Sequence, residues 1–102
     1  MNLTIIPVDG AVYVDGQSIS GLSFSAPQGV HALQWKSTKG WIEFMDSDDG
    51  TKPQNQMISE LPQWALDAKA KWDEAKAAAE AAAQAALKAA ANQPITTGAQ
   101  TL

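Results

Sequence analysis

Few residues in this 102-residue chain could support catalysis. His31 is the only histidine, and histidine chemistry needs an orienting acid with a nucleophile, or a second metal ligand. The chain has neither a G-x-S-x-G nor an H-E-x-x-H motif. Glu43 and Glu60 could form an acid–base pair, but no sequence feature links them. We therefore expect a structural role for His31 and no enzymatic activity.

The segment "DSDDG" contains the carboxylates Asp46, Asp48 and Asp49, a grouping that could bind a cation. An EF-hand calcium loop needs ligands at positions 1, 3, 5 and 12 and a glycine at position 6. Counted from Asp46, position 5 is Gly50 and position 12 is Met57, so the pattern fails. The segment is typical of an acidic, solvated turn, and no metal site is predicted. The alternative is that the three carboxylates form a weak cation site on the surface.

Four tryptophans could stack sugars or bases, or could anchor a core. We expect them to hold a sheet against a helix, and these anchors are Trp35, Trp41, Trp64 and Trp72. The alternative is a carbohydrate-binding module that uses Trp35 or Trp41 on an open sheet face.

Composition excludes several classes of partner. The net charge is −4 and all seven basic residues are lysines, which disfavours nucleic acid because phosphate recognition relies on positive charge and on arginine. The chain has no cysteine. No glycine pattern suits a phosphate, so no cofactor is expected. No apolar run approaches the roughly 18 residues of a membrane span. The sequence predicts a soluble, cytoplasmic protein without membrane contact.

Residues 1–58 show short runs of alternating polarity separated by turns, which predicts an antiparallel β-meander. The pairs Asp9-Gly10 and Asp15-Gly16 are strong turn signals. The stretch "GLSFSAP" alternates and is predicted to form a strand. The loop "KSTKG" is predicted to close a hairpin, with Gly40 free to take a positive φ.

The two strands of that hairpin have predicted faces. In "VHALQW", His31, Leu33 and Trp35 should share one face, because successive side chains alternate. In "GWIEFMD", Ile42 and Phe44 should share one face of the strand, and Trp41 should lie on the other face.

Residues 59–93 change to helical periodicity. Pro62 stands near the expected helix start, where its missing N–H costs nothing, and Pro94 marks the stop. Trp64, Ala68 and Trp72 share one face, so the first turns should pack on the sheet. We predict an α+β fold in which an N-terminal meander packs on the start of one long alanine-rich helix. Residues 94–102 are predicted to be a flexible tail.

The stretch from Ala75 to Ala91 is mostly alanine, which has the best helix propensity. It is either a solvated spacer or a face for docking or self-association, because small side chains let helices approach closely. The residues predicted for this interaction face are Ala75, Ala79, Ala82, Ala86, Leu87 and Ala90.

The order of three segments, "AVYVDGQSISGL", "VHALQWKSTKGWIEFMD" and "ISELPQWALDAKAKW", resembles small proteins encoded beside tail-fibre genes in tailed bacteriophages and prophages. The resemblance covers roughly residues 3–72. This chain departs from the pattern in its longer acidic insert and its long alanine helix.

The resemblance implies a non-enzymatic structural part of the tail, or a helper in tail-fibre assembly. The implied partner is a tail-fibre or baseplate protein, or a second copy through the C-terminal helix. The implied location is the host cytoplasm during assembly, or the tail of the virion.

Overall fold

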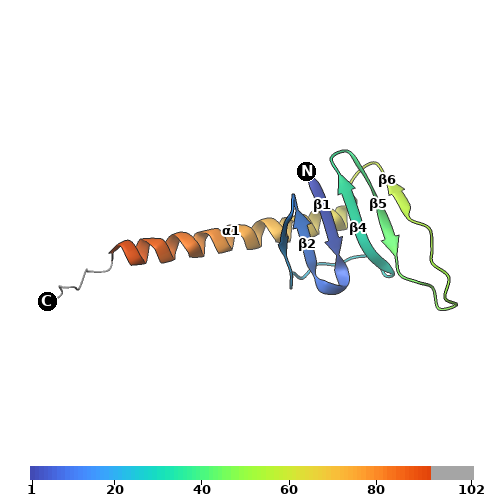
Figure 1. Ribbon diagram of the computed structural model, residues 1–102, viewed down its shortest axis with the longest axis horizontal. Coiled ribbons are helices and arrows are strands. Elements are labelled where there is room, and N and C mark those ends of the chain that lie inside the picture. The colour runs from blue at the N-terminus through green and yellow to red at the C-terminus, as the bar shows by residue number, and fades with distance from the viewer. Residues whose placement is uncertain (93–102) are drawn as a thin grey trace.

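The protein consists of a six-stranded sheet followed by one long helix (Figure 1). The computed structural model describes the backbone of residues 1–92 and the side chains of residues 1–90. The predicted α+β class and the order of sheet before helix are confirmed. The predicted flexible tail, residues 94–102, lies outside the described residues. The elements are β1 (Asn2–Ile6), η1 (Pro7–Asp9), β2 (Ala11–Val14), β3 (Gln17–Ile19), β4 (Val30–Lys36), β5 (Lys39–Phe44), β6 (Gln56–Ile58) and α1 (Gln63–Asn92).

The sheet is fully antiparallel, with strand order β3-β2-β1-β4-β5-β6. Two three-stranded meanders are therefore joined where β1 pairs with β4. The connection between them starts at the edge strand β3 and returns to the middle of the sheet.

The connection contains the predicted strand "GLSFSAP", which is irregular instead. Its backbone bonds to the η1 turn, because the Leu22 N–H donates to the Gly10 carbonyl at 3.0 Å. Leu22 and Phe24 still pack against the core, so their alternation reflected burial without strand pairing.

Two tight hairpin turns set the register. Asp15 and Gly16 take φ values of 48° and 87°, as a two-residue type I′ turn requires. In the second hairpin the turn is Ser37-Thr38, and the positive φ of 58° falls on Ser37. The prediction that Gly40 would take a positive φ is wrong, because Gly40 lies within β5 opposite Trp35. A Cβ on Gly40 would come within 2.9 Å of the Trp35 Cα.

The core lies between one face of the sheet and the first turns of α1. Leu3, Ile5, Val12 and Leu33 are the largest fully buried side chains, and Trp35 belongs to the same cluster.

His31 is exposed, so it does not share a face with Leu33 and Trp35 as predicted. The reason is a register shift between Val30 and Ala32, which breaks the alternation at His31.

The helix begins at Gln63, directly after Pro62, and is 30 residues long, which corresponds to about 45 Å. Beyond the sheet it continues as a single rod (Figure 1). Within the described residues, no helix combines the length and apolar character needed to cross a membrane.

We predict that Gly40→Ala lowers the free energy of unfolding by about 3 kcal/mol, because the new methyl group must push β4 and β5 apart. Urea denaturation would measure the loss. Gly50→Ala is the control: it has open space but a φ of +85°, so it should cost only about 1 kcal/mol. Equal losses in the two variants would show that steric contact at Gly40 is unimportant.

Candidate functional site

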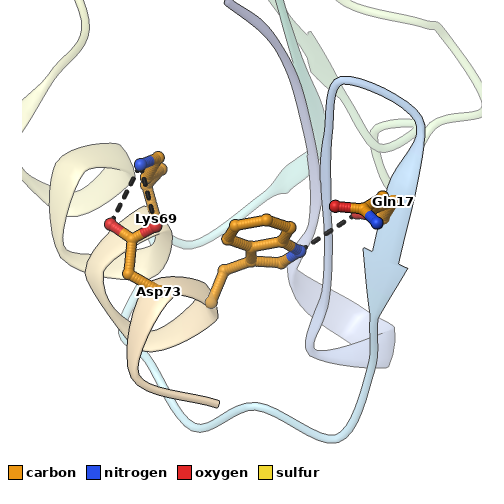
Figure 2. A network of polar contacts seen from close by, with 4 residues as sticks. Gln17, Lys69 and Asp73 are labelled. Carbon is orange, nitrogen blue, oxygen red and sulfur yellow. Dashed lines mark hydrogen bonds and ion pairs between the residues drawn. The ribbon is translucent and has the colours of Figure 1, made fainter. Parts of the chain in front are cut away.

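Trp72 fixes the helix against the sheet. Its side chain is buried, and its Nε1–H donates to the backbone carbonyl of Gln17 on β3 at 3.0 Å (Figure 2). The ammonium groups of Lys69 and Lys76 lie 6.0 and 5.7 Å from the centroid of the indole ring. These contacts join the edge of the sheet to the third turn of α1.

Two further tryptophans predicted as anchors lie at this contact. Trp35 is buried in the core cluster, together with Ala65 and Ala68 of the helix. Trp64 is half-buried and packs against the same cluster. The two alanines are completely buried, so their small side chains bring the helix backbone close to the sheet. The structure thus brings Trp35, Trp64 and Trp72 together.

Trp41 lies apart from these three, and the prediction that it anchors the helix is wrong. It pairs with Gln34, whose neighbours Leu33 and Trp35 face the core. Because side chains alternate along a strand, Trp41 lies on the face that α1 does not cover. Its Nε1–H donates to Glu43 Oε2 at 2.9 Å. Trp35 is buried and cannot stack on a glycan, so the carbohydrate-binding alternative rests on Trp41 alone.

The uncovered face, called the open face below, carries a row of side chains that periodicity did not single out. Cross-strand pairing sets them side by side, and the row consists of Tyr13, Thr4, Gln34, Trp41 and Met57. The alternation along each strand could have placed each residue on the face opposite the core. Assembling the row needed the pairing of β1 with β4, which no local pattern reveals.

The helix leaves the sheet shortly after Trp72. Ala75 and Lys76 are half-buried, and every side chain in residues 77–90 is exposed. Leu87 is 65% exposed. The alanine stripe, made of Ala75, Ala79, Ala82, Ala86 and Ala90, lies on the side of the helix that packs on the sheet, since 3.6 residues complete each turn.

The sides of the rod carry charge. Lys69 bonds Asp73 at 2.8 Å and Lys76 lies 3.3 Å from Glu80, both at i,i+4 spacing. Such exposed pairs each stabilise a helix by only about 0.2–0.5 kcal/mol. The charged flank therefore supports the rod without occupying the alanine stripe.

The acidic segment folds on itself. Asp49 accepts hydrogen bonds from the backbone N–H and the hydroxyl of Thr51, at 3.0 and 2.7 Å. These bonds lower the pKa of the Asp49 carboxyl below its usual value because they favour the charged form. Within residues 1–92 no cluster of three or more metal-ligating side chains occurs.

His31 lies beside a shallow hollow that is also lined by Phe44, Met45, Asp46 and Lys52. This lining offers an acid and a base but no hydroxyl or thiol. The structure also brings together two extended surfaces, the alanine stripe and the open face.

Comparison with known proteins returns no match to this chain, whether with family models, curated proteins or solved structures.

We predict that Trp72→Phe destabilises the fold by about 1–2 kcal/mol, because the Gln17 carbonyl loses its indole partner at a part-buried contact. Trp41→Phe makes the same chemical change on the open face and should cost about 0.5 kcal/mol or less, since water can replace its bond to Glu43. Chemical denaturation would rank the two variants. A larger loss for Trp41→Phe would contradict the role assigned to Trp72.

Proposed function

We propose that the protein is a non-enzymatic component of a bacteriophage tail, or a helper in tail-fibre assembly. In this proposal the projecting part of α1 docks on a tail-fibre or baseplate protein. The observation that carries the proposal is the continuous exposure of residues 77–90 on a helix whose first turns are fixed to the sheet.

The attachment of the helix makes the projecting segment suitable for docking. A short isolated helix is marginal in water even when it is rich in alanine, but residues 77–90 continue a helix whose first turns already pack on the sheet, and alanine has the best helix propensity. The buried contact at Trp72 holds one end of the rod. A partner therefore meets a preformed helix and orders fewer residues on binding, which favours affinity.

The chemistry of the alanine stripe favours a close helix–helix contact. Each methyl group buries little area, so the stripe needs a partner that approaches along several turns. Leu87 is the one large apolar side chain in this segment and stands exposed beside the stripe. A groove or helical bundle in an elongated fibre protein would match this long, narrow surface.

The resemblance of residues 3–72 to proteins encoded beside tail-fibre genes supports the choice of partner. It also supports a location in the host cytoplasm during assembly, or in the tail of the virion. A second copy of the chain is the other partner that the stripe could accept, and it would give a homo-oligomer.

We predict that the tail-fibre protein encoded beside this chain binds it, and that Ala86→Glu/Ala90→Glu weakens the complex at least about tenfold, or ~1.4 kcal/mol. The paired charges would have to be buried against the partner. Glutamate retains good helix propensity, so the rod itself should persist. Titration calorimetry with purified proteins would measure the affinity, and circular dichroism would check the helix.

Ala77→Glu/Ala81→Glu is the matched control, because it has the same spacing and charge but lies on the opposite side of the helix. This variant should bind normally. Light scattering would detect self-association of the chain alone. A monomer that does not bind the fibre protein would overturn the proposal, as would equal losses in the two variants.

A further inference from the structure

The open face has the form of an extended binding surface. Its row of side chains crosses four neighbouring strands from Tyr13 on β2 to Trp41 on β5, and β6 adds Met57. At about 4.8 Å per strand, Tyr13 and Trp41 stand roughly 14 Å apart. An elongated ligand could therefore touch an aromatic ring at each end and polar side chains between them.

The polar centre of the row can bond hydroxyl groups. The Thr4 hydroxyl donates to Gln34 Oε1 at 2.7 Å, which leaves the two amide N–H groups of Gln34 as donors. A shallow hollow of about 360 Å³ lies here, and its lining includes Asn2, Tyr13 and Gln34. The hollow combines amide and hydroxyl groups with an aromatic ring.

Two lysines place unbalanced positive charge at one end of the face. Lys36 and Lys39 pair directly across the β4–β5 hairpin and both are exposed. Like charges at such positions destabilise a sheet. Among residues 1–90 neither lysine has an ion-pair partner. Lys36 Nζ lies 5.8 Å from the centre of the Trp41 ring, so this charge adjoins the aromatic surface.

We propose that the open face binds a glycan that carries carboxylate groups. The apolar face of a sugar ring stacks on Trp41, its hydroxyls bond Gln34 and Thr4, and its carboxylate lies between Lys36 and Lys39. The ligand thereby relieves the repulsion between the two lysines. This site uses none of the residues of the alanine stripe and does not depend on the tail role.

Glu43 favours one orientation of the bound glycan. Its carboxylate accepts the Trp41 indole N–H at 2.9 Å and lies two residues further along β5, on the side away from the hairpin. A ligand carboxylate is repelled there, whereas sugar hydroxyls can donate to it. The acidic group of the glycan should therefore lie toward Lys36 and Lys39.

Other polymers fit this face less well. A peptide that adds a strand needs a free sheet edge, but β1, β2, β4 and β5 all have two strand neighbours. Nucleic acid requires several phosphates to be neutralised, whereas Lys36 and Lys39 supply only two positive charges here and the chain has no arginine. An acidic glycan matches the row better, because it offers sugar rings for stacking, hydroxyl groups for hydrogen bonds and carboxylates for the two lysines.

Calorimetric titration with tetragalacturonate, sialyllactose and a hyaluronan tetrasaccharide tests the proposal. At least one of them should bind with a dissociation constant of ~0.1–1 mM, as a shallow exposed site allows. Trp41→Ala should weaken that binding by about tenfold or more, as expected for loss of a stacking surface. The methyl ester of the bound glycan should bind several-fold more weakly than the acid.

Lys36→Gln/Lys39→Gln should remove the preference for the acid over its ester. Lys71→Gln/Lys88→Gln makes the same charge change on the helix and should leave the preference intact. A thermal melt would confirm that each variant is folded. Lack of binding by all three glycans at ~10 mM would overturn the proposal, as would binding unaffected by Trp41→Ala. Equal affinity for polyglutamate or single-stranded DNA would also overturn it, since charge alone would then explain the binding.

Discussion

The contact between Trp72 and β3 determines how the two halves of this protein are joined. One indole is buried and also satisfies a backbone carbonyl 55 residues earlier in the chain. A buried tryptophan contributes more apolar area than any other side chain on the helix, and its N–H needs a partner once it leaves water. The rest of α1 offers mainly methyl groups. Together with Trp64, Ala65 and Ala68, which pack on the same core, this contact sets the direction of the rod relative to the sheet.

The alternation of side chains along the strands gives the sheet two separate surfaces. Leu3 and Ile5 of β1 face the core with Leu33 and Trp35 of β4, while Thr4 and Gln34 between them lie on the open face. The helix covers only the first surface (Figure 1). The proposed glycan site and the alanine stripe therefore lie on different parts of the molecule, and one can change without altering the other.

Turns and the start of the helix could be predicted well from the sequence. The face of the sheet on which each side chain lies could be predicted less well. Asp15-Gly16 specifies its turn because both residues tolerate a positive φ, and Pro62 marks the start of the helix within one residue. The α+β fold class was predicted because the repeat of apolar residues changes from two residues in the first part of the chain to 3.6 residues in the second. The anchoring roles of Trp35, Trp64 and Trp72 were visible in the same patterns.

The errors share a physical cause, which is that the face of a side chain depends on register. A shift near Val30 exposed His31, and the turn fell at Ser37-Thr38, which left Gly40 in a strand. Trp41 was assigned to the helix contact because aromatic size alone does not tell which face is covered. The open-face row needed the pairing of β1 with β4, which are separated by more than twenty residues.

The length of the helix has a mechanical consequence. From Trp72 to Ala90 the rod extends by roughly 27 Å at 1.5 Å per residue. A small rotation of the helix where it packs on β3 would therefore move Ala90 by a much larger distance. The position of the far turns of α1 under load therefore depends on how firmly the first turns of the helix pack against the sheet.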